Sequence, residues 1–384
     1  MKLIDLIKQT GIYHRLLQTE YAKNFYLKRG VILDSEKIEN RLNQAPAIIL
    51  KNPPAKKIKV GIVKDGLVNI EGYAHRNSSW IFYERFLKNN QIDYQFYDIY
   101  RNNWLEVARE LDIIVWHTNS SPIDMYIAES KIYVLEKVLK KTCFPSFHEV
   151  WQYEDKNRST FLYKALNLPL IETFVSNSKK EASSMISRIK FPIIYKTYIG
   201  SSSKGVVKID NYSQAKKIVN KIFSHKGLRT VYPYFRQKNT VLFQRFISNA
   251  EFDLRIMMIG NKAFGYYRYA KKNDFRASGA GIYEKKEIPK EAIKIAIDIK
   301  NKLNSRLMGV DLLFCNKSNQ YKIIETSLFN QIDTPEQLVI NGVAGYYDLS
   351  TENFEFKEGK FWIHELVMEY IIENYCGGAE YEVS

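Results

Sequence analysis

Two acidic residues, Asp311 and Glu325, lie in short segments of otherwise apolar sequence near the end of the chain. A carboxylate in a buried strand is costly unless it is paired or binds a cation. If a turn at 317–319 joins two antiparallel strands, Asp311 lies opposite Glu325, and Ser327 shares a face with Glu325. Two carboxylates and a hydroxyl form an all-oxygen site that suits Mg²⁺. Lysines at the strand ends are the alternative partners of these carboxylates.

A run of small and polar residues follows the apolar segment 191–196, which ends in Lys196. Glycines let the backbone approach phosphate groups, and hydroxyl and ammonium groups can donate hydrogen bonds to them. The run differs from the GxxxxGK[ST] and GxGxxG motifs, so an ordinary hairpin tip is the alternative. Lys196 could reach a phosphate from the preceding strand. The run consists of Gly200, Ser201, Ser202, Ser203, Lys204 and Gly205.

Three arginines, Arg255, Arg268 and Arg276, fall within 22 residues of sequence that is rich in strand formers. A guanidinium group binds carboxylates and phosphates through two parallel hydrogen bonds. The cluster therefore predicts a site for an anionic substrate. The alternative is that these side chains lie on exposed strand faces.

The elements that position these residues are predicted from periodicity. Short apolar segments at 59–63, 92–99 and 113–116 alternate with a helical stretch at 80–87. This alternation is typical of a small parallel α/β sheet. From about residue 156 the pattern becomes rich in hairpins, with strands expected at the positions 191–196, 206–209, 241–247, 254–259, 263–268, 307–315 and 321–326. Together with a helix predicted at 291–303, this indicates an α+β region.

Composition limits the function without choosing it. The chain has 384 residues, and 57 basic against 42 acidic residues give a net charge of +15. This charge favours an anionic partner, although a generally basic proteome would give the same balance. No apolar run approaches the roughly 20 residues of a membrane-spanning helix. The three cysteines are widely spaced, which predicts a reducing, cytoplasmic location without a zinc site or a disulfide framework.

In order and spacing, the segments from about 150 to 330 resemble the ATP-grasp superfamily, most closely its ribosomal-protein glutamate ligase branch. Glutathione synthetase and D-alanine–D-alanine ligase are similar at greater distance. The resemblance implies an ATP-grasp fold preceded by a small parallel α/β domain, with a helical N-terminal extension. The segments that carry it are Asp155-Lys156, 191–196, 200–205, 241–247, 253–255, 274–276, 309–311 and 324–327.

The resemblance also implies a role for each matching residue. Lys156 and Lys196 would hold the phosphates of ATP, and the loop at 200–205 would close over them. Asp311 and Glu325 would hold Mg²⁺, with Ser327 in the position of the usual asparagine. The adenine site would be formed by Gln244, Arg245, Phe246 and Ile247. The ribose would bind to Glu251 or Asp253. The catalytic cations would be Arg255, Arg268 and Arg276.

The implied activity is an ATP-dependent carboxylate–amine ligase that works through an acyl phosphate and releases ADP and phosphate. Its substrates would be a small-molecule, peptide or glycan carboxylate and an amine, with specificity expected from 60–125 and 269–286. A role in tailoring a peptide or a surface polysaccharide is one expectation. An ATP-grasp kinase and a non-catalytic nucleotide- or nucleic-acid-binding protein are the alternatives, although no nucleic-acid-binding motif is present.

Five regions are expected. Residues 1–55 form a helical extension, an oligomer contact or a partner-docking arm, and a homo-oligomer is possible. The pre-ATP-grasp domain is expected at 56–150, and the central subdomain with the phosphate-covering loop at 151–240. The C-terminal subdomain with the metal site is expected at 241–350, and the helical tail at 351–384. His364, in the tail, is expected to be structural.

Overall fold

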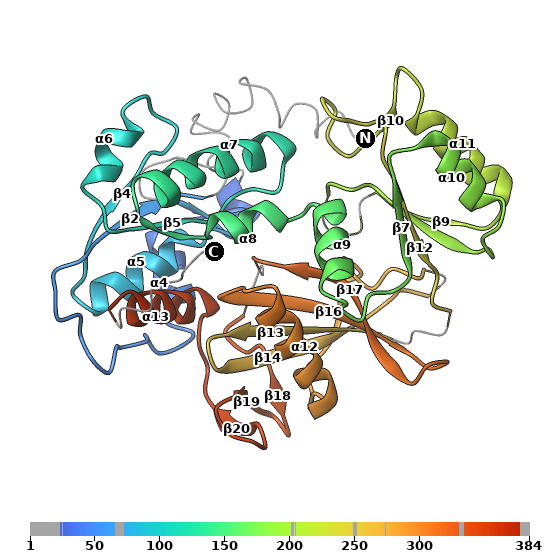
Figure 1. Cartoon of the computed structure of the whole chain (residues 1–384). Helices are drawn as coiled ribbons and strands as arrows, with labels where there is room; N and C mark the ends of the chain where they lie inside the picture. The colour runs from blue at the N-terminus through green and yellow to red at the C-terminus, as the bar shows by residue number, and fades with distance from the viewer. Residues whose placement is uncertain are drawn as a thin grey trace.

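A computed structural model describes residues 24, 26–65, 73–200, 203, 205–248, 252–272, 274–329 and 334–376. The molecule is built around three sheets, with a parallel sheet at one end, a four-stranded antiparallel sheet at the other and a large antiparallel sheet between and below them (Figure 1). The mixed α/β and α+β class predicted from the sequence is confirmed.

The parallel sheet has the strand order β4-β2-β5-β6. Its strands are β2 (Lys59–Val63), β4 (Asp93–Phe96), β5 (Ile113–Trp116) and β6 (Thr142–Phe144). Because β2 and β5 are buried along almost their whole length, both faces of the sheet must be covered. The helices of this region are α5 (Trp80–Asn89), α6 (Trp104–Arg109), α7 (Pro122–Tyr133), the π-helical turn η1 (Val134–Val138) and α8 (Phe147–Gln152).

The four-stranded sheet has the order β7-β12-β8-β9, and its neighbours run antiparallel. Its strands are β7 (Thr173–Ser176), β8 (Ile193–Lys196), β9 (Val206–Ile209) and β12 (Val241–Arg245). The apolar faces of α10 (Lys179–Ile186) and α11 (Tyr212–Ile222) pack against it and form one core with its strands. A two-stranded hairpin, β10 (Leu228–Arg229) and β11 (Arg236–Gln237), follows α11.

The large sheet has eight strands in the order β17-β16-β13-β14-β19-β18, with β15 paired to β14 and β20 paired to β19. Helices α9 (Lys156–Ala165) and α12 (Lys290–Lys302) pack near it. Its strands are β13 (Asp253–Ile259), β14 (Lys262–Tyr269), β15 (Ile282–Glu284), β16 (Leu307–Cys315), β17 (Gln320–Ser327), β18 (Val339–Ile340), β19 (Val343–Asp348) and β20 (Glu355–Glu358).

The C-terminal helix α13 (Ile363–Cys376) joins the parallel sheet to the large sheet, because it contacts both α5 and β13. Trp362, just before it, is fully buried against Phe82, with ring centroids 4.6 Å apart. After the strand β20, the chain becomes helical at Ile363. His364 is buried and stacks on Phe82, with ring centroids 4.8 Å apart, as a packing residue would.

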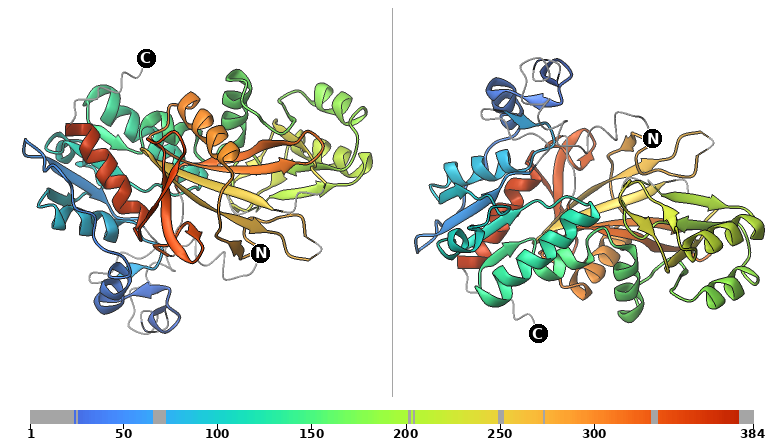
Figure 2. Two further views of the ribbon diagram at one scale, coloured as in Figure 1. Left: turned by 90° about the horizontal axis from the view of Figure 1, so that it is seen from below. Right: turned by 90° about the horizontal axis from the view of Figure 1, so that it is seen from above.

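The N-terminal segment is only partly helical in the region that the structure describes. It contains α4 (Ser35–Leu42) and β1 (Ile32–Leu33), and β1 pairs with β3 (Ala74–His75). This segment (dark blue) stands at one side of the molecule (Figure 2). The helical pattern predicted for 1–23 lies outside the described residues. Within the described ranges, no helix is long and apolar enough to cross a bilayer.

Candidate functional site

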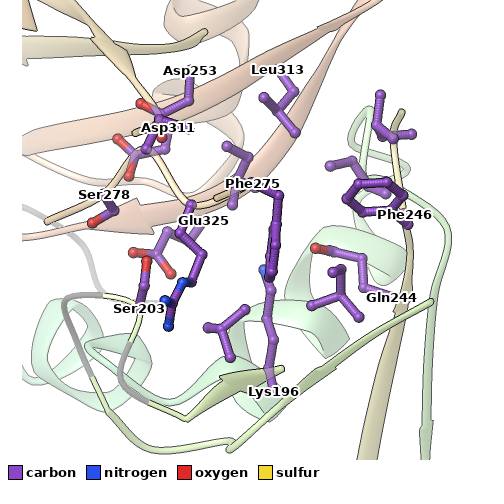
Figure 3. A pocket seen from close by; sticks show the side chains of 18 of the residues that line it. Lys196, Ser203, Gln244, Phe246, Asp253, Phe275, Ser278, Asp311, Leu313 and Glu325 are labelled. Carbon is purple, nitrogen blue, oxygen red and sulfur yellow. The ribbon is translucent and has the colours of Figure 1, made fainter. Parts of the chain in front are cut away.

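A cavity of about 300 Å³ lies between the four-stranded sheet and the large sheet. Gln244 and Phe246 line one side of it, and Asp253 and Asp311 line the other (Figure 3). Its polar lining comes from the start of α9, from strands of both sheets and from the loop that carries Arg276. The cavity therefore brings together residues that are up to 169 positions apart in the sequence, from Lys156 to Glu325.

Two lysines reach this cavity from different elements. Lys196 ends β8, and burial lowers the pKa of its ammonium group to about 8, although Glu325 opposes this shift. Lys156 begins α9, whose N-cap Asp155 accepts hydrogen bonds from two backbone N–H groups. The ammonium group of Lys156 donates to the carbonyl of Gly200 and lies 3.9 Å from Oε2 of Glu325. Both lysines can therefore contact one polyanionic ligand.

Asp311 and Glu325 lie directly opposite each other on β16 and β17, as the sequence predicted. The route to this pairing differs from the prediction. Cys315 pairs with Gln320, so the connecting loop has four residues, 316–319, and a bulge between Asp311 and Leu312 restores the expected register.

Asp311 is held by two arginines. Arg255 donates to both of its oxygens at 2.6 and 2.7 Å, and Arg268 approaches one of them at 2.7 Å. Burial would raise the pKa of Asp311, but the two guanidinium groups outweigh it and hold that pKa well below its usual range. Arg268 also pairs with Asp253, whose pKa burial raises although Arg268 opposes the shift. Arg268 and Asp253 line the cavity, whereas Arg255 acts behind Asp311.

Glu325 is the freer of the two carboxylates. About a third of its side chain is exposed, and the ammonium group of Lys156 lies 3.9 Å from its Oε2. Three of the roughly four acceptor positions of Asp311 are used by arginines. In the described ranges, no three His, Cys, Asp or Glu side chains are grouped to hold a metal ion. A Mg²⁺ ion fits this donor set, because it commonly takes one or two carboxylates plus phosphate and water.

The structure does not bring Ser327 to this cavity. Its hydroxyl donates to the carbonyl of Phe329 at 2.8 Å, and the side chain lines a separate small space beside Glu149 and Tyr153. At the end of β17 the serine therefore satisfies the backbone locally instead of facing the two carboxylates.

The expected adenine segment lies along one wall. β12 ends at Arg245, and Phe246 and Ile247 continue into the lining beyond the strand. Gln244 is fixed by a hydrogen bond from its Nε2 to Oγ1 of Thr173 at 2.9 Å. This wall is largely apolar, which suits a flat aromatic base. Its further apolar members are Ile171, Ile194, Val206, Leu313 and Ile324.

Arg276 pairs with Asp274 at 2.8 Å in a loop that lines the cavity. The side-chain hydrogen bond from Arg276 lowers the pKa of Asp274 to about 2. In contrast to Arg268, Arg276 is 44% exposed. Its guanidinium group is therefore able to change partner when an anion enters.

The loop between β8 and β9 is described in part, because Ser201, Ser202 and Lys204 lie outside the described residues. Glu251, which is a candidate for the ribose site, also lies outside them. Ser203 lines the cavity, and β8 and β9 form the predicted antiparallel hairpin. Gly205 has φ +85°, and a Cβ there would lie 2.2 Å from Oγ1 of Thr197. Only glycine fits this close approach.

The sequence analysis missed Glu154, the residue before Asp155. Its backbone is left-handed at φ 54°, a rare conformation for a residue with a side chain. Burial raises the pKa of its carboxyl group to about 6, while Lys156 opposes the shift. Glu154 lines a small space together with Lys156, Lys196 and Glu325. Its position next to the Asp155-Lys156 pair was the one available signal.

A second group of polar residues lies at the carboxyl ends of β2 and β5, within the range 60–125 from which specificity is expected. The imidazole Nδ1 of His117 lies 2.7 Å from the hydroxyl of Ser79, whose backbone N–H donates to Asp65 at 2.8 Å. The ring of His117 stacks on Phe329, with centroids 4.0 Å apart. Phe329 follows β17, so the loop after β5 contacts the chain just beyond the strand that carries Glu325.

The chain is similar in sequence to known ATP-grasp proteins. Residues 153–339 match the RimK-like ATP-grasp domain family. The alpha-aminoadipate–LysW ligase LysX of Saccharolobus solfataricus is 22% identical over 285 residues, covering 72% of this chain and 94% of that protein. The tetrahydromethanopterin:alpha-L-glutamate ligase of Methanococcus maripaludis is 27% identical over 179 residues, covering 45% of this chain and 56% of that protein.

Solved structures show the same fold. D-alanyl-alanine synthetase A from Vibrio cholerae superposes with a TM-score of 0.53 and 12% identity, covering 84% of this chain and 99% of that chain. D-alanine–D-alanine ligase from Bacillus anthracis, complexed with ATP, gives a TM-score of 0.51 and 12% identity, covering 72% of this chain and 88% of that chain. Residues 153–339 therefore form a RimK-like ATP-grasp domain, and the chain shares its fold with these two solved enzymes.

Proposed function

We propose that this ATP-grasp ligase joins a carboxylate to an amine in the cavity between the four-stranded and the large sheet. The observation that carries the proposal is the convergence of Lys156, Lys196 and Glu325 on one cavity with an apolar wall. Two cations beside a carboxylate that is about a third exposed suit a triphosphate with its metal ion, and the apolar wall suits a purine. ATP is the nucleotide used by the family.

Lys156 and Lys196 would hold the phosphates, and the backbone at Phe246 and Ile247 would bind the base edge. Glu325, with Asp311 behind it, would hold Mg²⁺, which neutralises phosphate charge when bound. Arg268 already donates to Oδ1 of Asp253. The ribose hydroxyl would therefore donate to the remaining acceptor positions of Asp253 or to Glu251.

The reaction has two steps. A substrate carboxylate oxygen attacks the γ-phosphorus, the bond to the ADP oxygen breaks, and an acyl phosphate forms. The amine nitrogen then attacks the acyl carbon, phosphate leaves with the bonding electron pair, and the nitrogen loses a proton. Phosphoryl transfer is catalysed mainly by positioning and by charge stabilisation.

The arginines have different parts in this scheme. Arg268 is held rigidly between Asp253 and Asp311 and provides a fixed positive field. Arg276 is exposed and paired only within its loop, so it can turn toward the transferred phosphoryl group. Arg255 acts through Asp311 and is a positioning residue.

The substrates enter, in this proposal, from the side of the parallel sheet. Its strand order changes direction between β2 and β5, and ligands of such sheets bind at the carboxyl ends of the strands at this point. Ser79 and His117 lie there, and the loop after β5 also accepts a hydrogen bond at Ser120 from the hydroxyl of Tyr232. The named relatives use amino acids, so we infer an amino acid as one substrate.

The three cysteines are free, which supports a reducing, cytoplasmic setting.

The test is ATP turnover with L-glutamate or L-2-aminoadipate as the acid, a panel of amines as acceptors, and mass spectrometry of the products. A ligase forms an amide with one equivalent each of ADP and free phosphate. A kinase would leave the phosphoryl group on the acceptor. Failure of every acid and amine pair to stimulate turnover, with Mg-ATP bound, would count against the ligase proposal.

A further inference from the structure

A second concave surface lies on the subdomain that carries Lys196. It has a volume of about 790 Å³ and lies between the end of α11 and the β10–β11 hairpin. We call it the basic groove. Its lining consists of Lys221, His225, Lys226, Leu228, Arg229, Arg236 and Lys238.

The basic groove differs from an ordinary charged surface in its sign pattern. Six of its seven lining residues are basic or histidine, and none is acidic. In the described part of the chain, none of its lysines or arginines has a carboxylate partner within 4.0 Å, although many other surface cations do, such as Lys357 with Glu355 at 2.6 Å. Cations gathered without counter-charges repel one another, so their natural complement is a polyanion.

The scaffold holds these cations in place. Gly227 has φ +64°, and a Cβ there would lie 2.6 Å from the side chain of Lys238, so the turn and the hairpin are packed closely. The backbone N–H of Asn239 donates to the carbonyl of Ile222 at 3.3 Å, which ties β11 back to α11. The basic groove is therefore part of the folded hairpin.

The position of the basic groove relates it to the active cavity. α11 packs on the sheet that contains β8 and β9, and β10 lies at the top of this subdomain (Figure 1). In the loop between β10 and β11, the hydroxyl of Tyr232 donates to the carbonyl of Ser120 at 2.9 Å. The hairpin that forms the groove thus also reaches the loop beside His117.

We propose that the basic groove docks an acidic polypeptide segment. No aromatic ring lines it, so it lacks the stacking surface with which proteins bind single-stranded nucleic acid. It also lacks the amide and carboxylate acceptors that would receive hydrogen bonds from sugar hydroxyls. Leu228 and the alkyl stems of the lysines provide apolar contact between the charges, which suits aspartate or glutamate side chains interspersed with aliphatic ones.

The role of the docked segment in the reaction rests on the proposed function, because the polypeptide would carry the carboxylate or the amine that the ligase joins. The docking itself does not depend on catalysis. Attraction between exposed charges weakens with salt, so binding should be strongest at low ionic strength.

The experiment measures fluorescence anisotropy of a labelled glutamate-rich peptide with the full chain, at low and at physiological salt. The triple variant Lys226→Glu, Arg229→Glu and Arg236→Glu should weaken binding by about tenfold or more, since like charges then face the peptide. A matched control, Lys179→Glu, Lys290→Glu and Lys294→Glu, makes the same change in net charge at exposed lysines elsewhere. It should leave the affinity within about twofold of the parent, because these sites lie outside the groove. Mg-ATP binding serves as the folding check for both triple variants.

Three results would overturn the proposal: undetectable peptide binding at low salt, equal loss in both triple variants, or tighter binding of an oligonucleotide of equal charge that the groove variant abolishes. ATP turnover is measured separately. Peptide binding without any turnover would reject the ligase proposal and keep the docking. Turnover without peptide binding would reject the docking alone.

Discussion

The active cavity and the basic groove use charge in opposite ways. In the cavity, Arg255 and Arg268 hold Asp311, Arg268 also holds Asp253, and most of these groups are buried. In the basic groove, the cations are exposed and have no acidic neighbour in the lining. Buried charges must be paired because desolvation is costly, whereas exposed ones can stay unpaired at little cost.

The difference shows why a net charge of +15 says little about function by itself. The cations proposed to bind ATP lie close to carboxylates that offset their charge. The cations of the basic groove lie on another surface and suit another partner.

The largest effect is expected from breaking the buried network. Asp253→Asn removes one partner of the buried Arg268 and should lower the free energy of unfolding by on the order of 3 kcal/mol. Chemical denaturation measures this change. The matched control is Glu355→Gln, which breaks an exposed pair with Lys357 and should cost less than about 1 kcal/mol. Equal losses in the two variants would contradict the contrast between buried and exposed pairs.

A slightly smaller effect is expected in catalysis. Glu325→Gln keeps the shape of the side chain but removes the charge that would hold Mg²⁺, so kcat should fall by roughly 10²-fold or more. Asp311→Asn should lose a similar factor and also stability, because it leaves Arg255 and Arg268 without their shared partner. Steady-state ATP turnover is measured for both variants and for the control Glu284→Gln, whose side chain is exposed and lies outside the cavity lining. Normal turnover in Glu325→Gln would remove this residue from the metal site.

The sequence predicted the fold class and the pairing of Asp311 with Glu325 because apolar strands and turns leave strong local patterns. It missed the bulge after Asp311, and it predicted a turn that is one residue shorter than the observed loop. The pairing was still correct because these two differences cancel in the register. It did not reveal that Arg255 and Arg268 share Asp311, because this contact depends on three adjacent strands. Ser327 turned away from the cavity for a local reason, a nearby backbone carbonyl, that no spacing indicates.

A moderate effect is expected from pH. The pKa of Lys196 is lowered to about 8 by burial, so the free protein loses this charge as the pH rises through about 8. Since the neutral amine cannot pair with phosphate, the affinity for Mg-ATP should fall by up to about tenfold between neutral and alkaline pH. Calorimetry at several pH values tests this fall. Lys196→Arg, which stays charged, should flatten the profile, and an unchanged profile would count against the role of Lys196.

The smallest effect is expected in the basic groove. Lys226→Gln removes an exposed charge without a carboxylate partner in the lining, so the free energy of unfolding should change by less than about 0.5 kcal/mol. The same denaturation experiment that tests Asp253→Asn measures it. A loss comparable to that of Asp253→Asn would show that the groove is built for stability.

We propose that Lys156 and Lys196 hold the triphosphate of ATP in the cavity between the sheets. Calorimetric titration of Mg-ATP into the parent, Lys196→Met and Lys226→Gln tests it most directly. We expect Lys196→Met to weaken binding by about tenfold or more, as for a lost charge-assisted contact, and Lys226→Gln to bind like the parent. Parent-like binding by Lys196→Met, or no binding of Mg-ATP by the parent, would contradict it.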